Sequence, residues 1–358
     1  MTIVLNNLRI SAGTFTIFCD HLEVKDNEYL VLLGPTGSGK TMLLETLAGF
    51  RSPESGSIQV NGTEFATLPP ERRNFALVHQ NHLLFPHMSV RDNIVYGLLM
   101  KGLTKNEIGQ RVEEITDYLD IKHLINRSID GLSGGERQII CLARAVISEP
   151  DLLLLDEPLG ATDPMRRDLL EKKVKNLHDG LGCPTIHVCH NFGEASRLAD
   201  RIAVMINGEL CAAGSAESIF RTPPKIEVAR FLGHQNIFRV AGRKGTKVLA
   251  AASHEETTTA GQPVSLTVER ESPSAAHLMV CAEDIEILPL KKHGWAWKEN
   301  TFKGKIVRIE EYGSHKQVRI TFGLKAFAHL SQREINEKEL KPGLEILVRI
   351  PPETIHLF

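Results

Sequence analysis

The 358 residues have a mass of 39.8 kDa and a formal net charge of −2, because 44 acidic residues slightly outnumber 42 basic ones. At one domain per roughly 100–200 residues, this length predicts two or three domains. The balanced charge provides no broad basic field for nucleic acid, and the 42% hydrophobic content excludes intrinsic disorder.

The chain has no apolar run near the ~20 residues that a membrane helix needs, and its start lacks a secretory signal. Its six cysteines are scattered and form no Cys-x-x-Cys pair, so neither a zinc site nor a disulfide framework is indicated. These features predict a cytoplasmic protein with reduced thiols.

Apolar strand patterns alternate with helical patterns over the first part of the chain, which predicts an α/β domain with a parallel sheet over residues 1–235. The strand–helix pairs are Tyr29–Leu33 with Met42–Phe50, Asp151–Leu155 with Met165–Asp179, and Thr185–Cys189 with Phe192–Asp200. Between about 89 and 148 only helical periodicity remains, over Asn106–Leu119 and Glu136–Ile147. We interpret this segment as a helical subdomain inserted into the α/β domain.

Residues 236–358 show a different sequence pattern, with short β-rich segments and no long helical periodicity. The clearest segments are Lys303–Glu311, Gln317–Phe322 and Leu344–Ile350. Ala250–Pro263 and Lys291–His293 are polar and are predicted to be loops. A separate β-domain is therefore expected after the α/β domain.

A glycine-rich segment fits the pattern G-x-x-x-x-G-K-[ST] and lies between a predicted strand and a predicted helix. It reads Gly34, Pro35, Thr36, Gly37, Ser38, Gly39, Lys40 and Thr41. Such a loop turns backbone N–H groups and a helix N-terminus toward a polyphosphate. Lys40 is then expected at the β and γ phosphates, and the Thr41 hydroxyl at Mg²⁺.

Two acids follow the apolar strand Leu152–Leu155, namely Asp156 and Glu157. A buried carboxylate is costly unless it meets a cation or water. Asp156 is therefore a candidate Mg²⁺ ligand, and Glu157 a candidate general base for an attacking water.

A second phosphate-binding device lies about ninety residues after the glycine-rich loop. Ser133 can cap the following helix, while Gly134 and Gly135 leave backbone N–H groups uncovered at its positive end, followed by Glu136. One nucleotide has a single γ-phosphate, so two such devices imply two ligands or one site shared between subunits.

The ordered set of these motifs resembles the nucleotide-binding subunit of ATP-binding cassette (ABC) transporters over residues 1–235. The resemblance implies ATP and Mg²⁺ as ligands. It assigns Gln80 to Mg²⁺ or the attacking water, His190 to the γ-phosphate and Asp163 to a loop that crosses to a partner subunit. It also implies a head-to-tail homodimer in which each signature segment, 133–136, closes over the partner's ATP.

The same resemblance predicts an aromatic residue that stacks on adenine; Phe15 is the first candidate and Phe18 the second, with a role in the core as the alternative. The sequence departs from the family pattern at Gly160 and Thr162 near the crossing loop, at Arg137–Ile139 after the signature, and at Asn191, where an Asp is usual. These departures are expected to alter the rate of hydrolysis and not to abolish it.

The apolar segment 81–90 resembles the surface on which importer subunits seat a membrane permease, although it could instead pack the inserted helices. A β-rich extension is also typical of importer subunits, which implies a cytoplasmic-face location and, indirectly, a solute-binding protein. The leading expectation is an importer ATPase for molybdate, tungstate or a related anion. Import of ferric iron, polyamine or sugar, and a soluble non-transport ABC ATPase, are the alternatives.

The last sixty residues resemble the OB-like β-barrel of molybdate- or oligosaccharide-binding regulatory domains, most clearly over 300–358. The segments that carry the resemblance are Phe302–Glu311, Leu340–Gly343 and Ile355–Leu357. Glu334 and Pro351 align where oxyanion-binding relatives have a hydroxyl residue and a lysine. A carboxylate facing a dianion argues against an oxyanion site at this position.

Overall fold

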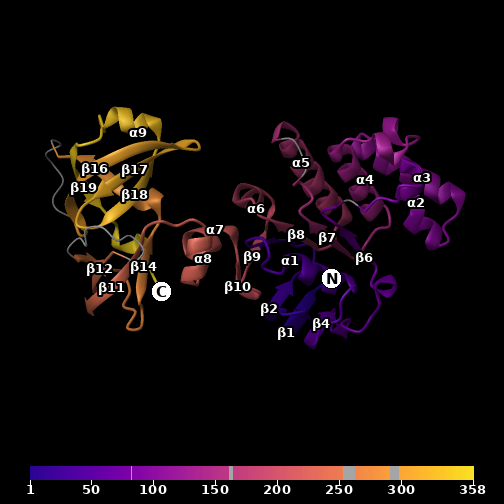
Figure 1. Ribbon diagram of the computed structural model, residues 1–358, viewed down its shortest axis with the longest axis horizontal. Coiled ribbons are helices and arrows are strands. Elements are labelled where there is room, and N and C mark those ends of the chain that lie inside the picture. Colours follow the sequence, from indigo (N-terminus) through magenta and orange to yellow (C-terminus); the bar gives the residue numbers. More distant parts are fainter. Residues whose placement is uncertain (82, 161–163, 253–262, 291–297) are drawn as a thin grey trace. The chain divides into compact units, whose positions relative to one another are not determined.

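The computed structural model describes residues 1–81, 83–160, 164–252, 263–290 and 298–358. The chain divides into two compact units, Met1–Ile219 and Phe220–Phe358 (Figure 1). The boundary expected near residue 235 thus lies inside the second unit, which begins with helical segments before its first strand. In the described ranges, no helix is both long and apolar enough to cross a membrane.

The first unit is built on a mixed sheet with the strand order β5-β4-β1-β2-β10-β9-β3-β8-β7-β6. Strands β3, β7 and β8 pair in parallel, as predicted, and β6 and β9 extend this parallel set, whereas β1, β2 and β4 form an antiparallel arm. The bounds are β1 Ile3–Ala12, β2 Phe15–Val24, β3 Tyr29–Leu33, β4 Ser55–Val60, β5 Thr63–Glu64, β6 Phe75–Val78, β7 Leu152–Asp156, β8 Thr185–Cys189, β9 Arg201–Ile206 and β10 Glu209–Gly214.

The predicted parallel strands are confirmed, and the structure adds an antiparallel arm that the sequence pattern did not indicate. Strand β1 alternates buried and more exposed residues, whereas every residue of β3, β7 and β8 is buried. Strands covered on both faces read as continuous apolar runs, while a partly solvated antiparallel strand alternates. Continuous apolar runs in the sequence therefore indicated β3, β7 and β8, whereas the alternating strand β1 gave no such signal.

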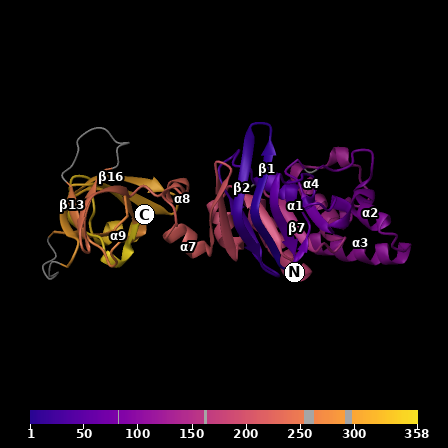
Figure 2. The same ribbon diagram turned by 90° about the horizontal axis from the view of Figure 1, so that it is seen from below.

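The helices of the first unit form two groups. Helices α2, α3 and α4 gather at one end of the unit, in the inserted subdomain that the sequence predicted, while α1, α5 and α6 follow strands of the sheet (Figures 1 and 2). The bounds are α1 Lys40–Ala48, α2 Val90–Met100, α3 Lys105–Leu119, α4 Gly134–Val146, α5 Pro164–Leu181, α6 Phe192–Leu198 and α7 Ala216–Arg221.

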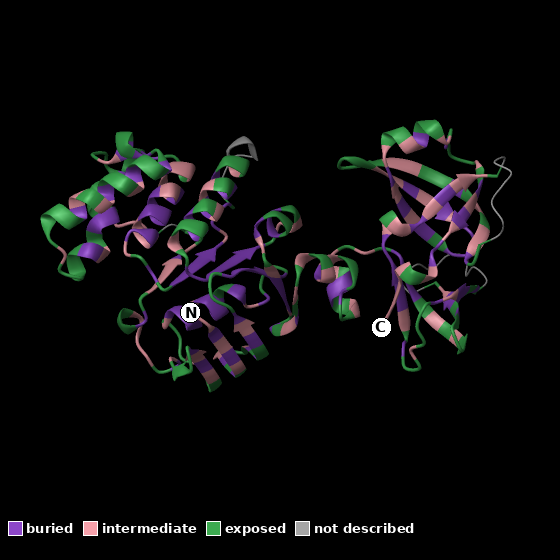
Figure 3. Ribbon diagram, turned by 180° about the vertical axis from the view of Figure 1, so that it is seen from behind, coloured by how far each residue is buried: buried purple, intermediate pink, exposed green. Residues whose placement is uncertain are grey.

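The second unit contains two antiparallel sheets, with the orders β13-β12-β11-β14-β20 and β15-β19-β16-β17-β18. A shared core that includes Phe238, Leu278, Ile320 and Val348 joins them, and Figure 3 shows the buried inner positions of these strands. The bounds are α8 Ile226–Phe231, β11 Ile237–Lys244, β12 Lys247–Ala251, β13 Val264–Thr267, β14 His277–Val280, β15 Glu286–Pro289, β16 Thr301–Tyr312, β17 His315–Thr321, β18 Lys325–Leu330, α9 Gln332–Glu337, β19 Glu345–Arg349 and β20 Ile355–Leu357.

Arg73 fixes the C-terminal end of α1. Its guanidinium is 2% exposed and donates hydrogen bonds to the carbonyls of Thr46 and Leu47 at 2.8 and 2.7 Å, and to those of Leu68 and Ala66 at 2.8 and 3.2 Å. The last carbonyls of a helix have no partner within the helix. Arg73 therefore completes α1 and joins it to the segment that leads into β6.

We predict that Arg73→Met lowers the free energy of unfolding by about 2–4 kcal/mol, because it leaves several buried carbonyls without donors. Urea unfolding monitored by circular dichroism measures this change. Arg72→Met is the matched control, since the neighbouring side chain is exposed. Equal unfolding midpoints for the two variants would contradict the assigned role of Arg73.

Candidate functional site

The glycine-rich loop connects β3 to α1 and depends on two glycines for its shape. Gly39 is the N-cap of α1 with φ +99°, and a Cβ there would lie 2.3 Å from Ile17 Cγ2. A Cβ on Gly34 would lie 2.1 Å from the Met205 carbonyl oxygen. Lys40 curls back on this loop, and its Nζ donates to the carbonyls of Gly34 and Pro35, at 2.8 Å each. Burial lowers the pKa of Lys40.

Asp156, at the end of β7, meets Thr41 at the start of α1. Thr41 Oγ1 donates to Asp156 Oδ2 at 2.9 Å, so the two residues expected at Mg²⁺ lie side by side. Asp156 Oδ1 and Ser38 Oγ are buried without a hydrogen-bond partner in the part of the chain that the structure describes. Burial, above all, raises the pKa of Asp156.

This oxygen set fits a small divalent cation. Mg²⁺ is usually bound by one or two protein oxygens together with substrate phosphates and water, not by an all-protein cage. Consistent with that, no group of three or more His, Cys, Asp or Glu side chains suited to a metal occurs in the described ranges. The unpartnered Asp156 Oδ1 is an acceptor that a cation or its water would satisfy.

Glu157 lies between the other two residues of the predicted catalytic set. Gln80 Nε2 donates to Glu157 Oε2 at 3.0 Å, and His190 Nδ1 lies 3.4 Å from Glu157 Oε1. Glu157 adopts φ +47°, which turns the chain sharply at the end of β7. The three residues, which come from three separate segments of the chain, thus form one cluster.

A cavity of about 530 Å³ opens over the loop and this cluster. Among the predicted residues, those that line it are Phe15, Thr36, Gly37, Gly39, Lys40, Thr41, Gln80, Glu157 and His190. Phe15 is 36% exposed and lines the cavity, whereas Phe18, which is 42% exposed, does not. The geometry thus favours Phe15 over Phe18 as the aromatic residue beside a bound base.

Sequence reasoning missed Met42, Glu45 and Arg51, which also line this cavity. Arg51 Nε forms an ion pair with Glu45. Glu45 lies one helical turn after Thr41, so the i, i+4 spacing along α1 was a usable signal. No motif in the sequence pointed to Arg51.

The signature segment does not line the cavity of its own chain. Ser133 is the N-cap of α4, and Glu136 closes a capping box by accepting from the Ser133 backbone N–H at 2.7 Å. Ser133 thus caps the helix as predicted, followed by Gly134 and Gly135 at its first positions. Asp163 and Thr162 lie outside the described residues.

The apolar segment 81–90 divides between its two expected roles. Phe85 packs on the inserted subdomain: its N–H donates to Asn93 Oδ1 at 2.8 Å, and its ring lies 4.9 Å from that of Tyr96. Leu83, in contrast, is 56% exposed. The packing alternative therefore holds for Phe85, and Leu83 is left as an exposed apolar side chain.

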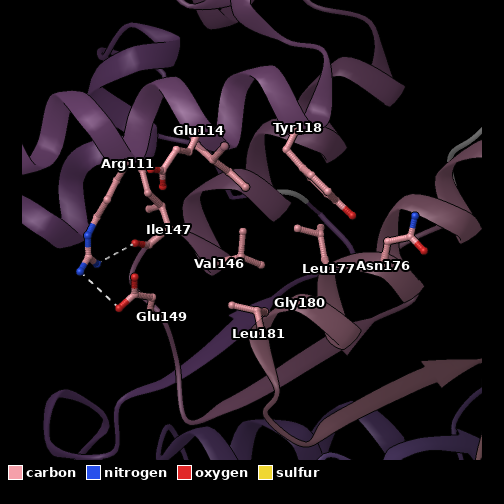
Figure 4. A pocket seen from close by; sticks show the side chains of 11 residues that line it. Arg111, Glu114, Tyr118, Val146, Ile147, Glu149, Asn176, Leu177, Gly180 and Leu181 are labelled. Atoms are coloured by element: carbon pink, nitrogen blue, oxygen red, sulfur yellow. Dashed lines mark hydrogen bonds and ion pairs between the residues drawn. The ribbon is translucent and has the colours of Figure 1, made fainter.

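A second cavity, of about 290 Å³, lies between α3, the C-terminal end of α4 and α5 (Figure 4). Its apolar side includes Val146 and Leu177, and at its edge Arg111 forms an ion pair with Glu149 at 3.2 Å. None of the residues predicted for the nucleotide site lines it. The two cavities are therefore separate sites.

In the second unit, Glu334 has its carboxylate engaged in hydrogen bonds at the start of a helix. It is the third residue of α9 and closes a capping box with Ser331, whose backbone N–H donates to Glu334 Oε2 at 2.9 Å. These hydrogen bonds lower the pKa of Glu334. Its carboxylate therefore occupies the helix end, and Pro351, which has no N–H, adds no donor near an anion.

A phosphate-binding loop between a buried strand and a helix, with Asp156 beside Thr41 and Glu157 beside Gln80 and His190, defines a P-loop nucleoside triphosphatase. The family model described as ABC transporter matches residues 20–160. The molybdate/tungstate import ATP-binding protein WtpC of Pyrococcus horikoshii is 35% identical over 339 residues, which cover 94% of each chain.

Two further similarities agree with this match. The spermidine/putrescine import ATP-binding protein PotA of Acetivibrio thermocellus is 34% identical over 94% of this chain and 90% of its own. A solved dimeric bacterial ABC transporter cassette is 25% identical, with a TM-score of 0.54, and covers 60% of this chain and 98% of its own.

The chain belongs to the ABC transporter family, as an ATP-binding and ATP-hydrolysing subunit of the importer type. The expected fold class, an ABC cassette with an inserted helical subdomain followed by an all-β domain, is confirmed.

We predict that Asp156→Asn stabilises the nucleotide-free protein at neutral pH. The ordinary pKa of an aspartate is 3.8, and that of Asp156 is raised in the folded state. Above pH 3.8 the unfolded chain therefore releases a proton that the folded protein still holds, which lowers the free energy of unfolding. The gain should grow as the pH rises from 3.8 through the folded pKa and vanish below 3.8. Unfolding midpoints across this range measure it, with the exposed Asp130→Asn as control. A destabilised Asp156→Asn at pH 7 would contradict the prediction.

Proposed function

We propose that ATP hydrolysis at the cavity over the phosphate loop drives uptake of molybdate or tungstate through separate membrane permease subunits. The observation that carries this proposal is the likeness to a molybdate/tungstate import protein, which extends over both units and 94% of each chain. Polyamine import is the second candidate, because the spermidine/putrescine relative has similar coverage. The chain acts at the cytoplasmic face of the membrane, supplied by a solute-binding protein on the other side.

Lys40 binds the phosphates in this proposal. In the nucleotide-free protein its ammonium is satisfied by two loop carbonyls, and burial disfavours its charge. An anionic polyphosphate would replace these carbonyls with charged acceptors, and hydrogen bonds between charged partners are stronger than those to neutral ones. Backbone N–H groups of the loop and the N-terminus of α1 add to this attraction.

Thr41 and Asp156 would hold Mg²⁺, with Gln80 as a further ligand from the opposite side of the cavity. When bound, Mg²⁺ neutralises charge that develops on the β and γ phosphates. The Thr41 hydroxyl donates a hydrogen bond to Asp156. On binding Mg²⁺ it would give up this bond, and its oxygen would coordinate the cation. Ser38 Oγ, buried and unpartnered, is a donor available to a phosphate oxygen.

Glu157 acts as the general base. In the nucleotide-free state Gln80 donates to one of its carboxylate oxygens, and His190 contacts the other. Both neighbours must shift for a water to take the place beside the carboxylate. Gln80 and His190 thereby link hydrolysis to the presence of the γ-phosphate, which His190 contacts.

A homodimer completes the site. The segment 133–136 does not line the cavity of its own chain, and α4 begins there with a positive helix end. In a head-to-tail pair this segment and Asp163 would close over the partner's ATP. Leu83, exposed on the segment after Gln80, is available to the permease.

The transport assignment is tested in proteoliposomes that contain the chain with its permease. We expect ATP-dependent accumulation of molybdate or tungstate. Accumulation of spermidine in place of the oxyanion would transfer the assignment to polyamine import.

In the same assay, Glu157→Gln should still bind ATP and lose at least ~10²-fold in hydrolysis and uptake, the usual scale for a lost general base. The exposed Glu353→Gln is the control. Normal turnover in Glu157→Gln would remove that residue from catalysis.

The dimer is tested by sedimentation of Glu157→Gln with ATP and Mg²⁺. We expect dimers that require ATP and that are lost when Ser133→Arg is added, because the bulky cation blocks the signature surface. Lys40→Ala should prevent dimers by weakening ATP binding itself. A double variant, Glu157→Gln with Ser133→Arg, that dimerises normally would contradict the shared site.

A further inference from the structure

His190 is held in place mainly by the helix that follows it. Its side chain is 64% exposed, and its Nδ1 lies 3.4 Å from Glu157 Oε1. Helix α6, which starts two residues later, has only seven residues. Helices this short are unstable alone in water, so tertiary contacts of α6 determine where it begins. These contacts therefore also determine the position of His190.

Glu194 departs from a pattern seen elsewhere in the chain. It is the third residue of α6, the position from which Glu107, Glu136 and Glu334 reach back to close capping boxes. Asn191 caps α6 by accepting from the Glu194 N–H at 3.0 Å. The Glu194 side chain instead turns inward, is 6% exposed, and places Oε1 3.0 Å from Nε2 of the fully buried His187.

His187 connects this carboxylate to the strand before the phosphate loop. Its Nδ1 lies 2.8 Å from the hydroxyl of Tyr29, the first residue of β3. The Glu194 carboxylate beside Nε2 can only accept a hydrogen bond, so the Tyr29 hydroxyl is the donor to Nδ1. His187 then carries its proton on Nε2, which faces Glu194.

The His187–Glu194 contact is close but not fully aligned. Although Nε2 and Oε1 are 3.0 Å apart, Nε2 has no hydrogen bond of good geometry in the described part of the chain. A buried donor without an aligned acceptor is unfavourable. A small rotation of the Glu194 carboxylate would align it with Nε2 of His187. Because Glu194 lies on α6, the alignment of this contact depends on the position of the helix.

Arg197, one turn further along α6, provides a second attachment. Its guanidinium donates to both carboxylate oxygens of Glu171 on α5, at 2.8 and 2.7 Å. Glu171 is buried, which makes this bidentate pair a fixed point for α6. Helix α6 is thus tied to the sheet through Glu194 and to α5 through Arg197.

We propose that Glu194 is a positioning residue that places His190 for hydrolysis through the buried chain Glu194–His187–Tyr29. The chain joins the helix after His190 to the strand that enters the phosphate loop, so the two sides of the ATP site move as one. This inference rests on the proposed function, in which His190 contacts the γ-phosphate.

The test compares steady-state ATPase kinetics of Glu194→Gln with those of Glu107→Gln, a matched third-position glutamate in the inserted subdomain. We expect Glu194→Gln to lower kcat about 10-fold or more with KM for ATP changed less than about twofold, because misplacement affects the reacting geometry and not phosphate binding. Tyr29→Phe, which removes only the hydroxyl, should lower kcat in the same way. Glu107→Gln should leave both constants unchanged.

A double-mutant cycle separates positioning from general loss of stability. On a His190→Ala background, Glu194→Gln should cause no further loss of kcat, because its effect passes through His190. An equal loss on both backgrounds, or a change confined to KM, would overturn the inference. Full turnover in His190→Ala would instead show that His190 does not have the role given to it in the proposed function. Loss in His190→Ala with normal kcat in Glu194→Gln would overturn the Glu194 inference alone.

Discussion

The ATP site depends on the parallel pairing of three adjacent strands. β8 lies between β3 and β7, with Leu33 opposite Cys189 and Asp156 opposite Val188. Because parallel strands end at the same edge, the phosphate loop, the Asp156–Glu157 pair and His190 all leave the sheet together. This pairing therefore brings groups from three separate segments to one cavity.

This arrangement places poorly satisfied polar groups around the cavity. The ammonium of Lys40 and the carboxylate of Asp156 are both partly desolvated, and burial lowers the pKa of Lys40 and raises that of Asp156. Asp156 Oδ1 and Ser38 Oγ have no hydrogen-bond partner in the described ranges. A ligand that carried both a cation and an anionic polyphosphate would satisfy all these groups at once.

Much of the fold and site could be predicted because it is encoded locally. The glycine-rich loop and the strands Tyr29–Leu33 and Thr185–Cys189 are contiguous patterns, and the structure has these strands with the predicted bounds. The antiparallel arm could not be predicted in the same way, since its strands alternate and pair through long-range contacts. The Tyr29–His187 bond joins residues 158 positions apart, and no single-sequence pattern reports such a contact. Glu194 was overlooked for a related reason, because its position suggests an ordinary capping glutamate.

Arg73 gives the first unit a mechanical property. Arg73 binds the last carbonyls of α1, the helix that begins at Lys40. Only Asn74 separates Arg73 from β6, and only His79 separates β6 from Gln80. Helix α1 and strand β6 are thus tied together at the end of α1 away from the phosphate loop, which gives the segment that carries Gln80 a fixed base.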